Sequence, residues 1–125
     1  MTNPLLENLS PKTKSKISFV KNNIDLEKIT DGLVSIHSSW SRQSIQNGIS
    51  ILQLIDEFDV VDFNIYIVDN DSIQIESQKD KLGFKSNGYF ESAFLLNGHV
   101  KSAFQNQNID IENFTRKIKQ LVTHR

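Results

Sequence analysis

The stretch that decides the fold reads Leu33-Val34-Ser35-Ile36-His37-Ser38-Ser39-Trp40-Ser41-Arg42-Gln43-Ser44-Ile45. Its first five residues lean apolar and predict a strand, whereas a helical pattern begins near Ile45. A strand that runs through a sharp turn into a helix leaves the first backbone N–H groups of that helix unpaired and partly positive. The segment Trp40-Ser41-Arg42-Gln43-Ser44 lies at this turn, and we therefore expect it to form the site of the protein.

The segments after this turn predict a helix and then a strand. The helix covers about residues 42–58, because apolar residues line one face of it at Ile45, Ile49, Leu52 and Ile55. Ser41 has a side chain suited to the N-cap of this helix. The strand covers residues 60–68, where β-branched and aromatic residues alternate and place Val61, Phe63, Ile65 and Ile67 on one side. It ends at the turn residues Asp69-Asn70-Asp71.

The C-terminal part predicts a hairpin and a terminal helix. Asn97-Gly98 joins the runs 90–96 and 99–104, and this dipeptide favours a tight turn because both of its positions accept positive φ. The terminal helix starts near Asn108 or Asp110, and its apolar face consists of Ile111, Phe114, Ile118, Leu121 and Val122. Residues 72–82 fit either a short helix or an irregular segment, and the helix is favoured.

The N-terminal part is less regular. Residues 1–16 contain both prolines and predict a loosely ordered arm, followed by a domain over residues 17–125. Residues 17–20 predict a short strand or helix, and residues 25–29 predict a short helix. The first residues lack the basic start and long apolar run of a secretory signal, and no apolar run has the length of a membrane span. A cytoplasmic location is therefore expected.

The order of the predicted elements indicates the fold class. It runs strand, helix, strand, helix, strand, strand, helix, which is typical of α/β domains. Two strands joined by a helix are expected to be parallel neighbours through a right-handed crossover, and the hairpin adds an antiparallel pair. We expect a central mixed sheet of about four or five strands with helices on both faces.

Composition excludes several functions. The chain of 125 residues has a net charge of −1, which gives no electrostatic reason to expect nucleic acid or an anionic membrane as partner. It contains no cysteine, and this excludes thiol redox chemistry, disulfides and thiolate metal sites. The three histidines lack ligand spacing, and Asp69-Asn70-Asp71 lacks the glycine and the distant glutamate of a calcium loop. We therefore expect neither a metal nor another cofactor.

The element order, with Trp40-Ser41-Arg42-Gln43-Ser44 after the first inner strand and the late hairpin around Asn97-Gly98, resembles the thioredoxin fold over roughly residues 18–122. Thioredoxins carry cysteine at the second and fifth places of this loop, where this chain has serine. The chain is more closely similar to redox-inactive bacterial thioredoxin-like proteins whose loop reads Trp-Ser-Gly-Pro-Ser. A Gly-x-x-Glu segment follows later in those proteins, here Gly88-Tyr89-Phe90-Glu91, whereas Arg42-Gln43 departs from their Gly-Pro.

This resemblance implies that the redox chemistry of the family is lost at three places. The two cysteines are serines, the buried acid of the family falls on Ser35, and no proline follows Pro11 to supply the family's cis-proline. Phe90 or Glu91 occupies the place of that proline. Laboratory exchange of the cysteines would not also remove the acid and the proline. We interpret the loop as naturally redox-inactive, and a Cys-to-Ser variant of a thiol-disulfide oxidoreductase stays as an alternative.

Two hypotheses concern the activity of the loop. The favoured hypothesis is a protein-binding module, because Trp and Arg side chains dominate binding hot spots; its surface comprises Trp40, Ser41, Arg42, Gln43, Ser44, Tyr89, Phe90 and Glu91. By analogy, one form of such a module is an immunity protein that neutralises a toxin. The alternative is a serine-dependent enzyme that pairs Ser41 with His37 or Glu91.

A purely structural interpretation of the loop also stays open. Trp40 can pack over the core of its own domain, while the two serines only stabilise the start of the helix. Arg42 is then an ordinary solvated side chain. A positive charge at a helix start is mildly unfavourable, however, and this favours an acidic partner or a bound anion near Arg42.

Overall fold

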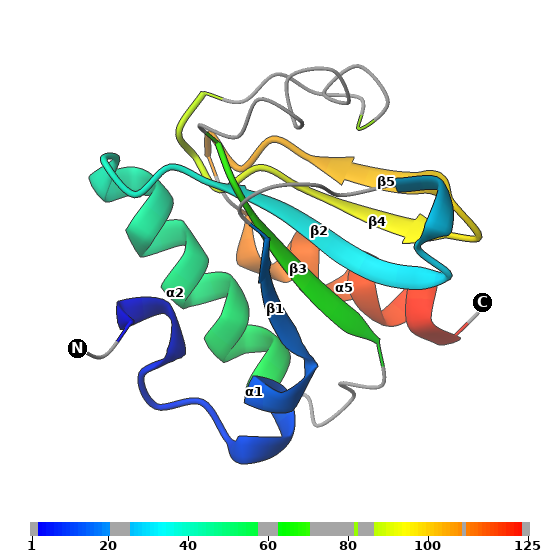
Figure 1. Cartoon of the computed structure of the whole chain (residues 1–125), viewed down its shortest axis with the longest axis horizontal. Helices are drawn as coiled ribbons and strands as arrows, with labels where there is room; N and C mark the ends of the chain where they lie inside the picture. Colours follow the sequence, from blue (N-terminus) through cyan, green and yellow to red (C-terminus); the bar gives the residue numbers. More distant parts are fainter. Residues whose placement is uncertain are drawn as a thin grey trace.

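The structure is a computed structural model that describes residues 3–20, 26–57, 63–70, 82, 87–108 and 110–123. A five-stranded sheet lies at its centre, in the order β1-β3-β2-β4-β5 (Figure 1). The strands are β1 (Ile17–Val20), β2 (Asp31–His37), β3 (Asn64–Asp69), β4 (Ser92–Leu96) and β5 (His99–Phe104). The helical elements are η1 (Pro4–Leu6), α1 (Pro11–Lys16), η2 (Leu26–Lys28), α2 (Arg42–Glu57) and α5 (Ile111–Thr123). The expected mixed α/β sheet is confirmed.

The crossover from β2 through α2 to β3 is parallel, as predicted. Leu33 of β2 is the register partner of Ile65, and His37 at the end of β2 is the partner of Asp69. β1 joins the outer side of β3, also in parallel, whereas β4 runs antiparallel to β2. Because β2 lies inside the sheet, its central residues are buried on both faces. The loop after His37 therefore starts from a fixed strand end.

Helices α2 and α5 lie together on one face of the sheet (Figure 1). The core on that face combines the apolar stripes of both helices with inward strand residues: Leu33, Ile51, Leu52, Ile55, Phe63, Ile65, Ile67, Phe94, Phe104, Phe114 and Ile118. The opposite face is covered, in the described part, by η2 and Leu82 rather than by a long helix. Most of the predicted 72–82 helix lies outside the described residues. Where an α-helix was expected at 25–29, the structure has the 3-10 helix η2.

Residues 3–16 do not form the loosely ordered arm that the sequence favoured. Leu5 and Leu9 are buried in the core beside α2. The Asp56 carboxylate on α2 accepts a hydrogen bond of 2.6 Å from the Ser10 hydroxyl and another from the Thr13 hydroxyl. Both prolines occupy the first turns of the short helices η1 and α1, where a missing N–H has no cost. The prolines thus start helices instead of breaking structure.

The hairpin and the terminal helix agree with their predictions. Asn97 and Gly98 have φ of 53° and 79°, the backbone that a two-residue turn between β4 and β5 requires. The helix α5 begins after Asp110, whose carboxylate accepts a bond of 3.0 Å from the Asn113 N–H. Its buried residues Phe114 and Ile118 face the sheet.

Candidate functional site

The loop between β2 and α2 is held by the hydroxyl of Ser41. This hydroxyl accepts from the Ser44 N–H at 3.2 Å, the N-cap contact that the sequence predicts, and donates to the Gly88 carbonyl at 2.7 Å. The Ser41 N–H donates to the Ser38 carbonyl at 3.0 Å, which closes a tight turn around Trp40. Among the described residues, the Ser41 hydroxyl contacts no basic group that could act as the general base of a serine nucleophile.

His37 is paired with Ser44 rather than with Ser41. The distance from His37 Nδ1 to Ser44 Oγ is 2.8 Å, and Ser44 Oγ also accepts from the Ser38 N–H at 3.1 Å. The pKa of His37 is lowered, because the effect of burial is larger than the opposite effect of the nearby Asp69 carboxylate. The lowered pKa favours the neutral imidazole at pH 7, and a hydrogen bond joins its Nδ1 to the Ser44 hydroxyl. Ser44 is completely buried and has no access to a substrate.

The segment before β4 is shaped by Gly88, Phe90 and Glu91. Gly88 has a φ of 82°, and a Cβ atom there would lie 3.1 Å from Ser41 Oγ, so the loop and this segment meet at a position suited to glycine. Phe90 also has a positive φ of 60° although its side chain is buried. The buried Glu91 carboxylate accepts from the N–H groups of Asn87 and Tyr89. The Gly-x-x-Glu segment thus folds a turn around its own glutamate.

Two asparagines that the sequence interpretation missed fix the carbonyls of this segment. Asn47 on α2 donates to the carbonyls of Tyr89 and Asn106, at 2.8 and 3.0 Å. Asn106 in turn donates to the Phe90 carbonyl at 2.7 Å. A polar residue on the buried side of α2 is the one sequence signal that could have identified Asn47, whereas Asn106 has no local signal.

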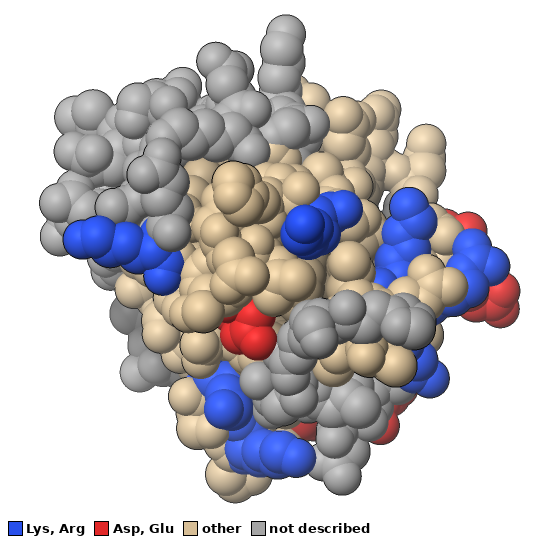
Figure 2. Space-filling view, turned by 90° about the vertical axis from the view of Figure 1, so that its right-hand side faces the viewer, with Lys and Arg blue, Asp and Glu red and all other residues tan. Residues whose placement is uncertain are grey.

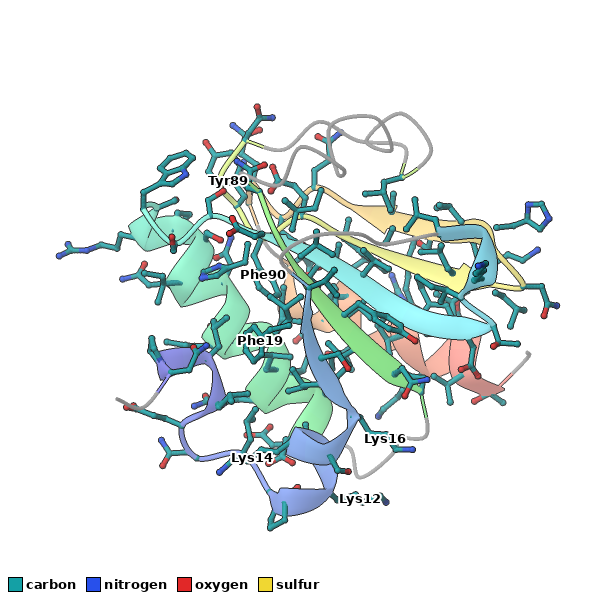
Figure 3. All side chains as sticks on the ribbon, viewed as in Figure 1. Lys12, Lys14, Lys16, Phe19, Tyr89 and Phe90 are labelled. Atoms are coloured by element: carbon teal, nitrogen blue, oxygen red, sulfur yellow. The ribbon has the colours of Figure 1, made fainter. Side chains whose placement is uncertain are left out.

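The predicted site residues divide into an exposed and a buried set. Trp40 is 67% exposed, which excludes the interpretation in which it packs over its own core, and Arg42 and Gln43 are exposed beside it. Ser41 and Tyr89 are half-buried. Ser44, Phe90 and Glu91 are buried and act only as support from below. Tyr89 and Phe90 lie near the N-terminal end of α2 (Figure 3).

The resemblance to thioredoxins assigned a buried acid to Ser35 and a cis-proline to the Phe90–Glu91 segment, and the structure has neither group at these positions. Ser35 Oγ lies 2.8 Å from Ser92 Oγ, so two buried hydroxyls satisfy each other at the position to which the resemblance assigned a carboxyl group. All described peptide bonds are trans, including those around Phe90. Among the described residues, no group of three or more His, Asp or Glu side chains is placed to hold a metal ion. No described helix has the length and apolarity to cross a membrane.

Comparison with known proteins gives the fold. No protein-family model matches this sequence, and no curated protein sequence matches it. Oxidized thioredoxin O2 from Arabidopsis thaliana superposes with a TM-score of 0.66 at 19% identity, covering 87% of this chain and 96% of its own. A putative oxidoreductase with a thioredoxin fold gives 0.61 at 15% identity, covering 86% and 97%.

A chain from the complex of ferredoxin:thioredoxin reductase and thioredoxin f2 is a third similar structure. Its TM-score is 0.61 at 12% identity, and the alignment covers 85% of this chain and 94% of that one. At such low identities the similarity extends to the fold alone, and the chain has the thioredoxin fold.

Proposed function

We propose that the protein is a redox-inactive thioredoxin-fold module that binds a protein partner through the Trp40 surface, which we define as Trp40, Arg42, Gln43 and Tyr89. The observation that carries the proposal is the 67% exposure of Trp40 on a hydrogen-bonded loop. Because the loop is already ordered, a partner that buries the indole loses little loop entropy on binding. Tryptophan is also enriched among residues that dominate binding energy.

The partner is recognised mainly through side chains. The carbonyls of Gly88, Tyr89 and Phe90 already accept bonds from Ser41, Asn47 and Asn106, respectively. Two N–H groups of the same segment donate to Glu91. The backbone beside Trp40 therefore offers few free groups for pairing with an extended peptide, and a folded partner with a pocket for the indole fits better.

The charge of the surface favours an acidic partner. Arg42 is exposed at the positive end of α2, where a carboxylate would be attracted by both the guanidinium and the helix dipole. The complex that contains thioredoxin f2 supports the general idea, because there a thioredoxin occurs together with a protein partner. An immunity protein that neutralises a toxin is one form of this function, by analogy alone.

Redox inactivity belongs to the same proposal. The sequence has no cysteine, and hydroxyl groups take the places of both sulfurs and of the acid at Ser41, Ser44 and Ser35. We place the chain in the Ser-x-x-Ser branch of thioredoxin-like proteins for this reason. A serine-dependent enzyme receives less support, because Ser41 lacks a base and Ser44, which has one, is buried.

Affinity capture from the native host lysate tests the proposal. The bait proteins are the wild type, Trp40→Ala and the matched control Phe19→Ala, since Phe19 is the other exposed large apolar residue described, at 41%. Phe19 lies on edge strand β1, which β3 separates from β2 (Figure 3). We expect a partner that wild type and Phe19→Ala retain and Trp40→Ala loses. Equal recovery with all three baits contradicts the proposal.

A further inference from the structure

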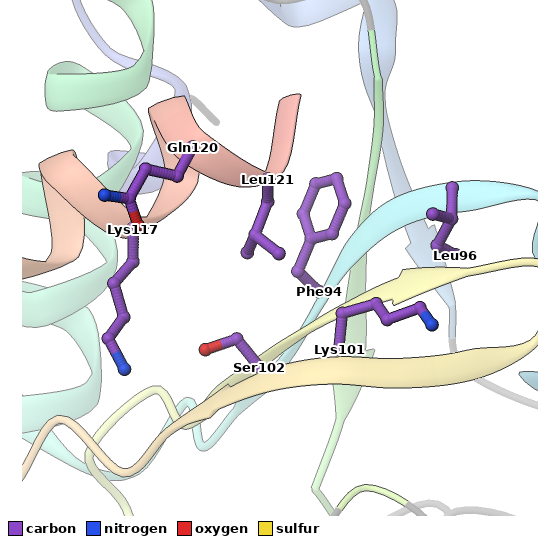
Figure 4. Close-up of a pocket in the computed structure, with 7 residues that line it drawn as sticks. All are labelled: Phe94, Leu96, Lys101, Ser102, Lys117, Gln120 and Leu121. Carbon is purple, nitrogen blue, oxygen red and sulfur yellow. The ribbon is translucent and has the colours of Figure 1, made fainter. Parts of the chain in front are cut away.

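A hollow lies away from the Trp40 loop, between the β4–β5 hairpin and the C-terminal half of α5 (Figure 4). Its volume is about 510 Å³, which is within the range of pockets that hold small organic ligands. The lining residues come from β4, β5 and α5: Phe94, Leu96, Lys101, Ser102, Lys117, Gln120 and Leu121. No residue of the Trp40 surface is among them.

The hollow exists because β5 carries a small residue where its neighbour is large. Ser102 is the register partner of Phe94, so both side chains project from the same face of the hairpin. Two residues further along β5, Phe104 fills the corresponding space by packing on Phe114, with ring centroids 4.6 Å apart. The Ser102 hydroxyl is too small to do the same, and the space next to it stays open.

The floor and one wall of the hollow are apolar. Phe94 is buried at its base, where the ring of Phe63 supports it in an edge-to-face contact of 5.5 Å. Leu96 and Leu121 are half-buried and complete the apolar part. A hydrocarbon chain placed here would cover apolar surface that is now partly exposed to water.

The rim of the hollow is positive. Lys117 on α5 and Lys101 on β5 lie at opposite sides, with Ser102 between them (Figure 4). None of the seven lining residues carries a carboxylate. On the described part of the face in Figure 2, Lys and Arg side chains occur in several separate places, and Asp or Glu side chains lie beside some of them. The lining of this hollow thus combines two lysines with an apolar floor and lacks a carboxylate.

A neighbouring hollow of about 220 Å³ limits where an anion can lie. It shares Lys117 with the first hollow, but its other lining is polar and includes the Asp110 carboxylate. A second negative charge next to Asp110 is unfavourable. An anionic ligand with an apolar body is thus confined to the hollow over Phe94.

We propose that this hollow binds an aliphatic carboxylate. Its chain lies against Leu96 and Leu121 above the buried Phe94, and its carboxylate faces the ammonium group of Lys117, which forms a charge-assisted hydrogen bond. The ammonium group of Lys101 points away from Ser102 (Figure 4) and attracts the carboxylate over a longer range. The Ser102 hydroxyl supplies a further donor. This site is independent of the Trp40 surface and adds a small-molecule ligand to the proposed protein-binding function.

Titration with decanoate, below its micelle concentration and at low salt, tests the site. The readout is the ¹H–¹⁵N NMR spectrum of the full chain, with decan-1-ol as the uncharged probe. We expect saturable shifts at the lining residues and decanoate affinity at least about tenfold above that of decan-1-ol. Lys117→Gln should weaken decanoate binding by about threefold or more and Lys101→Gln by a smaller factor, whereas the exposed Lys28→Gln on η2 should not weaken it.

Ser102→Phe should abolish decanoate binding by filling the hollow, and a circular dichroism spectrum shows whether that variant is folded. Lys101 and Lys117 are exposed, so their variants should fold and still test the site if Ser102→Phe does not fold. Absence of saturable shifts, shifts at other residues, equal binding of decan-1-ol, or insensitivity to both lysine variants each overturns the proposal. Trp40→Ala should bind decanoate like the wild type, so failure of this site leaves the Trp40 surface untouched.

Discussion

Ser44 links the strand β2 to the helix α2 through its hydroxyl group alone. The hydroxyl is hydrogen-bonded to His37 Nδ1 and accepts from the Ser38 N–H, while the Ser44 N–H donates to Ser41. Each of these contacts fixes the turn that presents Trp40. A buried donor or acceptor that loses its partner is costly, so the serine pair stabilises the loop rather than reacting.

Replacement of Ser44 by Ala should therefore lower the free energy of unfolding by about 1–3 kcal/mol, because the His37 ring and the Ser38 N–H lose their partner. Urea unfolding measures this difference. Ser39→Ala is the matched control, since Ser39 lies exposed in the same loop, and its effect should stay within about 0.5 kcal/mol. An equal effect of both variants would show that the Ser44 contacts do not hold the loop.

Stability should depend on pH through His37. Burial lowers its folded pKa below the unfolded value of 6.5, so the unfolded chain binds the proton more readily as the pH falls. The contribution of neutral His37 is present above the unfolded pKa and is lost as the pH falls through the folded pKa. Urea midpoints at about pH 7.5 and about pH 5.5 should differ more in the wild type than in His37→Gln. Identical pH slopes in the two proteins would refute this assignment.

Sequence reasoning succeeded for individual residues only where the contact is local. The Ser41 cap lies within one helical turn of its partner Ser44, and the spacing alone predicts it. The pairing of His37 with Ser44 depends on the exact length of the intervening turn, and the sequence instead suggested Ser41. Asn47 and Asn106 are 59 residues apart, and nothing local relates them.

At the scale of elements, the N-terminal segment is the main difference between prediction and structure. The helix α2, the strand β3 and the Asn97-Gly98 hairpin follow local periodicity and turn chemistry, and the structure has all three. The order around residues 3–16 comes from contacts with α2, where Gly48 leaves room for Leu5. Contacts with a distant helix cannot be predicted from the local sequence of a short segment that contains two prolines.

Leu5→Ala should consequently destabilise the whole domain by about 2–5 kcal/mol, as expected for a fully buried leucine. Thermal or urea unfolding gives the value. Glu7→Ala, at an exposed position just after η1, serves as control and should have almost no effect. A loosely ordered segment would instead make the two variants indistinguishable.

For the whole molecule, the thioredoxin fold was predictable from the order and spacing of its elements, since these set the parallel crossover and the late hairpin. The function was not predictable, because the thioredoxin fold occurs in proteins with many activities. The loop of this chain resembles the thioredoxin loop in its tryptophan and its spacing but has no cysteine. What the structure adds is the separation of the predicted site into an exposed Trp40 surface and a buried support that includes Ser44, Phe90 and Glu91.

Restoring the two sulfurs should not restore an efficient oxidoreductase. The double variant Ser41→Cys and Ser44→Cys still has Ser35 and the Phe90–Glu91 segment at the positions to which the resemblance assigns an acid and a proline. Its rate of disulfide reduction should be about a hundredfold below that of a thioredoxin in the same assay, because the proton-transfer group is absent. A rate equal to that of a thioredoxin would mean that the scaffold is not disabled.

The central claim is that Trp40 is the main contact with a protein partner. The affinity of the captured partner for the purified wild type, Trp40→Ala and Phe19→Ala tests this claim most directly. Isothermal titration should show Trp40→Ala weakening the complex by at least about tenfold. Phe19→Ala, which removes the other exposed aromatic described, should leave the affinity unchanged. Unchanged affinity in Trp40→Ala, or an equal loss in both variants, would contradict the account.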